Sequence, residues 1–195
     1  MRFKRLRTET EFERYRASFA EVFARESKGR TADLPVEYLR ASMPFGVFDR
    51  NGEMVAGYTL AIGPRLRLLE FVPAEARAKL VVPGGKTWAD CCEITVAWKR
   101  PEVTALFMAS RFWPRTVLGV LATGKPFLLG HNQSERLDKF YTGLGPKTLY
   151  AGPSSFGLPS RLFVYGRTRM ILSVLLLWSA ITPWRAVRSF VGGGK

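Results

Sequence analysis

Two side chains of this sequence stand where they could transfer protons. Glu93 lies within a β-branched run, residues 92–98, that predicts a strand, and a carboxylate there can accept a proton from a reacting amine, directly or through water. His131 is the only histidine and ends a second apolar run, so it is a candidate base. The structural alternatives for Glu93 are an exposed strand residue or a pair with a neighbouring arginine, and for His131 a non-catalytic side chain at a strand end.

The residue types exclude several other chemistries. One histidine cannot supply a multi-histidine metal site, so no metal is expected. Cys91 and Cys92 are the only cysteines, and neighbours on a strand point to opposite faces, so neither a disulfide framework nor a metal knuckle can form. Unpaired cysteines are typical of a reducing compartment. The basic N-terminus is followed by the glutamate-rich residues 8–13 instead of an apolar signal core, so we expect a cytoplasmic protein.

The charge of the chain is concentrated in its second half. The 195 residues carry 30 Lys and Arg against 16 Asp and Glu, a formal charge of +14. Residues 1–102 hold 18 basic and 14 acidic side chains, whereas residues 103–195 hold 12 basic and 2 acidic ones. Such a surface steers acidic partners toward it. The length predicts one domain.

The elements that must position Glu93 and His131 follow from hydrophobic periodicity and turn signals. Thr8 with Glu11 is a capping-box pattern that predicts a helix, and Asp33 is expected to cap a second, short helix. The pair Asn51-Gly52 predicts a hairpin. The predicted order is a strand (2–6), a helix (8–26), a short helix (33–43), two hairpin strands (45–49, 54–60), a strand (92–98), a helix broken near Pro114 (103–121), a strand (126–130), a helix (134–144) and two strands (148–151, 161–165).

This order of elements resembles the GNAT acyltransferase superfamily. The most specific fragment is the strand ending at His131-Asn132, followed by Phe140-Tyr141-x-x-Leu144-Gly145 and a return strand. The resemblance covers residues 2–166. It implies an α/β domain with a mixed sheet of six or seven strands, in which two central parallel strands splay apart, with flanking helices.

The resemblance also assigns roles to particular residues. It implies that main-chain amides of Val96, Ala97 and Trp98 bind pantetheine and polarise a thioester carbonyl, and that Tyr141 protonates the leaving thiolate. Asn132 matches an asparagine that commonly follows the fifth strand of the family; its alternative role is to cap the next helix.

The family's phosphate-binding loop would lie at residues 100–105. Arg100 and Ala105 fit its pattern, but Val103 replaces a glycine and Glu102 adds a negative charge. Both obstruct the approach of a pyrophosphate to helix N-terminal amides. The sequence is therefore similar to the branch near acyl-homoserine lactone and long-chain N-acyl amino acid synthases, which also lack a good glycine loop. Many of those take the acyl chain from an acidic acyl carrier protein, which a basic surface would attract.

The C-terminal residues 167–195 extend past the part that resembles the family. Residues 170–184 are uncharged, a run of 15 that is shorter than the roughly 18 residues that span a bilayer. We expect an apolar helix and a flexible Gly-rich tail. The helix can pack on the domain, form a homodimer, line a tunnel for an acyl chain or lie on a membrane surface through residues 170–190.

The resulting hypothesis is an N-acyltransferase with no tightly bound cofactor. It would move an acyl group from the pantetheine thioester of acyl-CoA or an acyl carrier protein to the amine of a small-molecule acceptor. The alternatives are a protein of the same fold directed at tRNA or another nucleic acid, and a membrane-surface protein without catalysis. The basic residues are scattered, without an aromatic-basic motif, which disfavours nucleic acid.

Overall fold

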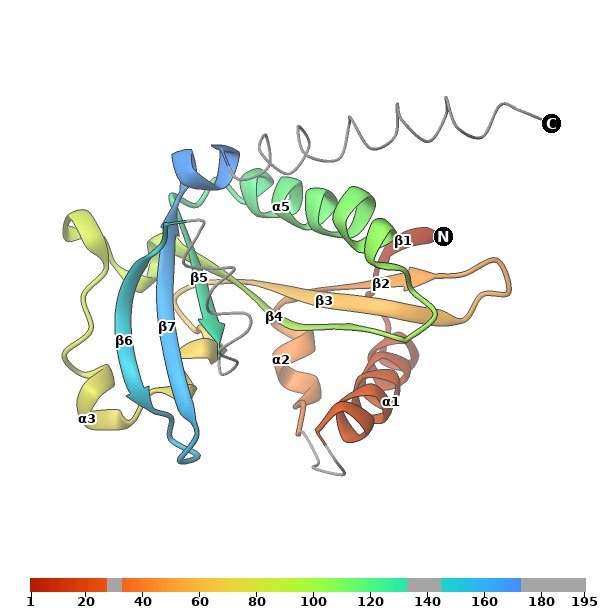
Figure 1. Cartoon of the computed structure of the whole chain (residues 1–195), viewed down its shortest axis with the longest axis horizontal. Helices are drawn as coiled ribbons and strands as arrows, with labels where there is room; N and C mark the ends of the chain where they lie inside the picture. The colour runs from red at the N-terminus through yellow and green to blue at the C-terminus, as the bar shows by residue number, and fades with distance from the viewer. Residues whose placement is uncertain (28–32, 133–144, 173–195) are drawn as a thin grey trace.

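The computed structural model describes residues 1–27, 33–132 and 145–172. These residues form a single mixed sheet of seven strands in the order β1-β2-β3-β4-β5-β7-β6, with helices on both faces (Figure 1). Neighbouring strands are antiparallel except β4 and β5, which are parallel. The expected mixed α/β fold with a central parallel pair is confirmed.

The first half of the chain builds the antiparallel part of the sheet and the two helices that cover one of its faces. The elements are β1 (Arg2–Arg5), α1 (Glu9–Glu26), α2 (Val36–Arg40), β2 (Met43–Phe48) and β3 (Met54–Ile62).

The predicted helix start and hairpin are both present. The Thr8 hydroxyl accepts from the Glu11 amide at 3.3 Å, and the Glu11 carboxylate accepts from the Thr8 amide at 3.1 Å, which completes the capping box. Gly52 takes a φ of +81° in the turn between β2 and β3, a conformation that glycine adopts at little cost.

The prediction that Asp33 caps the second helix is wrong. That helix begins after Pro35, whose ring fixes a φ of −58°, and no side chain caps it.

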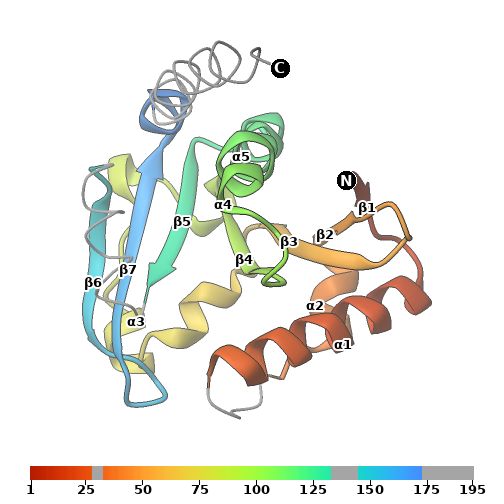
Figure 2. The same cartoon turned by 45° about the vertical axis from the view of Figure 1, so that its right-hand side comes forward.

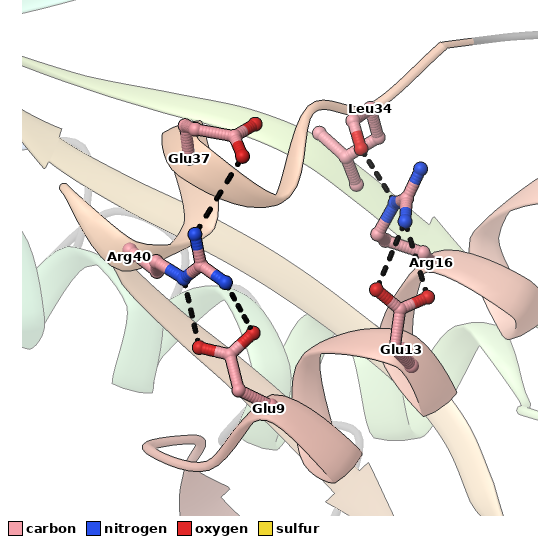
Figure 3. Close-up of polar contacts among 6 residues, drawn as sticks. All are labelled: Glu9, Glu13, Arg16, Leu34, Glu37 and Arg40. Carbon is pink, nitrogen blue, oxygen red and sulfur yellow. Dashed lines mark hydrogen bonds and ion pairs between the residues drawn. The ribbon is translucent and has the colours of Figure 1, made fainter.

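Charged contacts hold α2 against α1 (Figure 3). Arg40 donates from Nε and Nη2 to the two carboxylate oxygens of Glu9, both at 2.8 Å. Arg16 donates to the Leu34 carbonyl at 2.7 Å. Glu9 and Arg40 are exposed, so their ion pair adds little to stability. These contacts fix the position of α2, which carries Tyr38 beneath the centre of the sheet.

The second half of the chain supplies the remaining strands and the helices of the opposite face. The elements are η1 (Arg67–Phe71), α3 (Ala74–Arg77), η2 (Pro83–Gly85), η3 (Trp88–Asp90), β4 (Cys91–Lys99), α4 (Ala105–Phe107), η4 (Met108–Phe112), α5 (Trp113–Ala122), β5 (Phe127–Asn132), β6 (Lys147–Pro153) and β7 (Pro159–Gly166). The helix predicted over 103–121 is thus three segments, and its middle segment, η4, has π geometry just before Pro114. Proline lacks the amide that a regular α-turn would use there.

The buried residues of the described chain form three hydrophobic clusters. Phe12, Tyr15 and Trp98 belong to the cluster under α1, while Tyr58 and Phe112 belong to the cluster under α4 and α5. A third cluster joins the segment of η1 and α3 to β5 and β7. Figure 2 shows α1 and α2 on one side of the sheet and α5 on the other.

Two sequence predictions fall partly or wholly outside the described residues. Residues 167–172 are helical, which agrees with the start of the predicted C-terminal helix. The rest of that helix, and the predicted helix over 134–144 with Tyr141, lie outside the described residues. Within the described ranges, no helix has the length and hydropathy needed to traverse a bilayer.

Candidate active site

The central parallel strands are joined only at their first residues. The register pairs of β4 and β5 are Cys91 with Phe127, Cys92 with Leu128 and Glu93 with Leu129. Beyond them, β4 continues to Lys99 and β5 to Asn132, and Figure 1 shows the two strands diverging. We call the opening between residues 94–99 and residues 130–132 the fork.

Each arm of the fork is held by its outer neighbour. On one side, β5 stays paired with β7 through its last residue, Asn132, which lies opposite Arg161. On the other, β4 stays paired with β3 as far as Lys99, which lies opposite Ala56. The fork is therefore a fixed feature of the sheet and is not caused by fraying of either strand.

A β-bulge lies in the β4 arm of the fork. Gly57 pairs with Trp98 and Thr59 pairs with Thr95, so Val96 and Ala97 together lie opposite one residue of β3. Val96 has a φ of +50°, which is unusual for a β-branched residue. A bulge redirects the main chain locally, and strained backbone of this kind concentrates at functional sites.

Buried side chains hold the bulge in place. The Tyr15 hydroxyl donates to the Val96 carbonyl at 2.9 Å and accepts from the Thr59 hydroxyl at 3.2 Å. A Cβ on Gly57 would lie 2.6 Å from the Tyr15 ring and 2.9 Å from Trp98 Nε1, so this position requires glycine. The hydrogen bond from Tyr15 of α1 therefore helps to hold Val96 in its unusual conformation.

Three predicted pantetheine-binding residues lie along this arm. Val96 is half-buried and Trp98 is buried, both in the cluster under α1, where the Trp98 ring makes an edge contact with Tyr15 at 5.9 Å. Ala97 is exposed. The arrangement brings the three residues together at the fork, with Ala97 the most accessible. Their part in binding a thioester stays a prediction.

Glu93 lies at the base of the fork and is fully buried, with 0% of its surface exposed. Its carboxylate accepts hydrogen bonds from the amides of Arg67 and Leu68, at 2.8 and 2.9 Å, and from the Tyr38 hydroxyl at 2.9 Å. Burial raises the pKa of Glu93, and these hydrogen bonds act in the opposite direction. It is therefore not an exposed strand residue, and within the described part of the chain no arginine side chain forms an ion pair with it.

Three residues of this site carry no signal in the sequence. Tyr38 contacts Glu93 across a separation of 55 residues, and the Arg67 guanidinium lies 5.3 Å from the centre of the Tyr38 ring. Tyr15 looks like an ordinary apolar-face residue of α1. Each role depends on contacts between distant elements, which local periodicity does not encode.

His131 lies at the tip of the other arm. Its Nε2 is 2.7 Å from the Ser160 hydroxyl, and its ring stacks on Phe71 with 4.5 Å between ring centres. The structure does not show His131 in contact with Glu93, and its role as a base stays a prediction.

Nuclear magnetic resonance can isolate His131, because it is the only histidine of the chain. Burial lowers the pKa of His131 to about 4 from its ordinary value of 6.5. We expect one imidazole signal that titrates near this value in the folded protein. Between pH 6.5 and pH 4 the imidazole of the unfolded chain binds a proton that the native imidazole does not bind. The free energy of unfolding therefore falls by roughly 2 kcal/mol as the pH drops from 6.5 toward 4. A midpoint near 6.5 would contradict the described burial.

The predicted phosphate loop takes another form. The Arg100 side chain pairs with Glu21 of α1 at 3.2 Å, and its amide donates to Val55 at 2.8 Å. Val103 is buried in the core, which explains why a large apolar residue occupies a glycine position of the family pattern. Ala105 is the first residue of α4. Phosphate binding by Arg100 and Ala105 stays a prediction.

The remaining candidates are either buried or outside the described residues. Asn132 is buried, with 6% of its surface exposed, and ends β5. Tyr141 lies outside the described residues. Among the residues that the structure describes, no group of three or more acidic, histidine or cysteine side chains is placed to hold a metal ion.

A shallow hollow of about 260 Å³ lies away from the fork. It is lined by Phe127 at the start of β5, with Pro83, Lys147, Val164 and Arg169 nearby. It therefore lies at the opposite end of β5 from His131, and it does not contribute to the candidate site.

No protein-family model matches the sequence, and no curated protein matches it. Solved structures do match the fold. FeeM, an N-acyl amino acid synthase from uncultured soil microbes, superimposes with a TM-score of 0.62 at 15% identity, covering 85% of this chain and 91% of FeeM. MesI, a CoA-dependent acyl-homoserine lactone synthase, gives 0.59 at 16% identity over 87% of this chain and 91% of MesI. An aminoglycoside 6'-acetyltransferase gives 0.55 at 11% identity, over 85% and 97% of the two chains. At these identities, the likeness establishes the fold.

Proposed function

We propose, from the premise that this chain has the GNAT fold, that it is an N-acyltransferase which moves an acyl group from a pantetheine thioester to the amine of a small molecule. The observation that carries the proposal is the fork with its bulge at Val96. A central strand whose main chain is unpaired on one side offers amides to a ligand, as an edge strand does. A pantetheine arm carries amide groups that match such a strand.

The reaction needs three functions at the fork. The thioester carbonyl must be polarised, and amides of residues 96–98 are the proposed donors. The acceptor must lose a proton before it attacks, for which Glu93 at the base of the fork is the proposed acceptor. The leaving thiolate must gain a proton, and Tyr141 is the proposed source from the family resemblance. His131 is a second candidate base on the opposite arm.

The acyl donor is proposed to be bound to an acyl carrier protein or to coenzyme A. The buried Val103 and the pairing of Arg100 with Glu21 are against a glycine-type pyrophosphate loop, which favours the carrier protein. Residues 103–195 carry 12 basic and 2 acidic side chains, and this positive charge also favours an acidic partner. MesI, which shares the fold, is a CoA-dependent synthase, so both donors belong in the test.

The acceptor is proposed to be a small primary amine. FeeM is named as a synthase of N-acyl amino acids and MesI as a synthase of acyl-homoserine lactones. Free amino acids and homoserine lactone are therefore the first acceptors to examine.

The test measures thiol release with Ellman's reagent, using decanoyl-CoA or a decanoyl-acyl carrier protein with each acceptor. Cys91 and Cys92 are buried, and burial raises the pKa of both thiols to about 11, so the folded protein should contribute little background. We expect acceptor-dependent thiol release and an N-acyl product of matching mass. Thiol release that does not depend on any amine, or none at all with either donor, would contradict the proposal.

A further inference from the structure

The Tyr38 hydroxyl lies between two polar groups of β4. It is 2.9 Å from Glu93 Oε1 and 2.6 Å from the Thr95 hydroxyl. Glu93 lies at the last register pair of β4 and β5, whereas Thr95 lies beyond it, within the fork. Thr95 has 7% of its surface exposed and Tyr38 is half-buried, so this short chain of oxygens leads from the β4 arm of the fork to a carboxylate that solvent does not reach.

The directions of these hydrogen bonds follow from the number of protons present. An ionised Glu93 only accepts, and it already accepts two backbone amides in addition to Tyr38. The single phenolic proton of Tyr38 therefore goes to Glu93, so the Thr95 hydroxyl donates to Tyr38. A lone pair of the Thr95 oxygen then remains as an acceptor. Both hydroxyls, of Thr95 and of Tyr38, therefore donate in the direction that leads from the fork to Glu93.

The surroundings of Tyr38 and Glu93 favour holding one mobile proton there. The Arg67 guanidinium lies over the Tyr38 ring, and Glu70, also on η1, is the carboxylate that raises the pKa of Glu93 by its charge. From β5, the register neighbour of Glu93 is the apolar Leu129. Burial raises the pKa of Tyr38 and of Glu93, so the phenol stays protonated while the carboxylate gains in basicity.

We propose that Thr95 and Tyr38 form a proton relay that carries a proton from the ammonium group of the acceptor to Glu93. This inference rests on the proposed function, which it deepens by naming how a buried carboxylate serves a reaction in the fork. Tyr38 and Thr95 are positioned to pass the proton without an intervening water between Thr95 and Glu93.

The proton balance is complete without another reactant. The ammonium nitrogen donates to Thr95, Thr95 donates to Tyr38 and Tyr38 donates to Glu93, so that one proton moves inward and each hydroxyl keeps one. The free amine attacks the thioester carbon, the C–N bond forms and the C–S bond breaks. The second proton lost by nitrogen goes to the thiolate, which leaves as a thiol. Glu93 then returns its proton to solvent by the reverse route.

The test compares Tyr38→Phe and Thr95→Val with the wild-type chain across pH. Phenylalanine keeps the ring under Arg67 and removes only the hydroxyl. At pH 7 we expect kcat/KM to fall about 100-fold in each variant, within the range of general-base catalysis. The loss should shrink as the pH approaches the pKa of the acceptor amine, because a free amine no longer needs the relay. A purely structural defect would not recover with pH.

Two controls on the outer strand β6 separate the relay from the loss of a hydrogen-bonded hydroxyl elsewhere in the sheet. Tyr150→Phe removes a hydroxyl that donates to the Pro153 carbonyl at 2.6 Å on the outer strand β6. Thr148→Val removes a hydroxyl that accepts from Arg161 at 2.9 Å. Both should keep the wild-type pH profile. If the wild type transfers acyl groups and Tyr38→Phe behaves as Tyr150→Phe does, or its loss is the same at every pH, the relay is wrong. If the wild type itself transfers none, the proposed function fails and the relay with it.

Discussion

Replacement of Ala97 by tryptophan is expected to lower kcat/KM for an acyl thioester at least about 100-fold, because small displacements of a reacting group cost that much. Ala97 is the exposed residue of the bulge, and it lies beyond the last pair of β4 and β5. An indole there would occupy the opening into which the pantetheine arm is proposed to run. The measurement is thiol release at several concentrations of decanoyl-CoA and of the decanoyl-acyl carrier protein.

The control for this variant is Ala151→Trp, which adds the same side chain at an exposed position of the outer strand β6. It should leave kcat/KM unchanged. Both variants should melt close to the wild-type temperature, since neither alanine is buried. Full activity of Ala97→Trp would mean that the thioester does not enter between the two strands.

Replacement of Glu93 by alanine is expected to lower the free energy of unfolding by about 4 kcal/mol, because it leaves buried donors without an acceptor. The donors are the amides of Arg67 and Leu68 and the hydroxyl of Tyr38. Urea unfolding followed by circular dichroism measures the change. Glu93→Gln should lose less, because its carbonyl oxygen can still accept.

Glu70→Ala is the matched control, since it removes an exposed carboxylate from the same short helix, η1. Its free energy of unfolding should change by less than about 0.5 kcal/mol, as is usual at surface positions. A similarly small change in Glu93→Ala would show that the carboxylate does not hold η1 to β4.

The local structure of this protein is largely readable from its sequence. The capping box at Thr8 and the Asn51-Gly52 hairpin are encoded within a few residues, and both are present. Asp33 is not the cap because Pro35, two residues later, sets the start of α2. The predicted break near Pro114 occurs as a π segment, since proline removes one amide from the helical ladder.

The candidate site was predictable only in part. The fork came from resemblance to a family, because no local pattern states that two parallel strands will separate. Glu93 was identified as a carboxylate in a central strand, but its burial depends on η1, and the predicted order of elements contains nothing between residues 60 and 92. The contact of Tyr38 with Thr95 spans 57 residues, and such contacts exist only once the sheet and α2 are assembled.

The position of β7 between β5 and β6 determines when β5 gains its second neighbour during translation. Residues 127–132 leave the ribosome before residues 159–166, which supply the full-length neighbour of β5. A nascent chain that ends before this last strand holds β5 by its three residue pairs with β4 alone and leaves the outer edge of β5 exposed. The last strand to be synthesised therefore supports one arm of the fork from outside, and a shortened translation product would present an unpaired strand edge that favours aggregation.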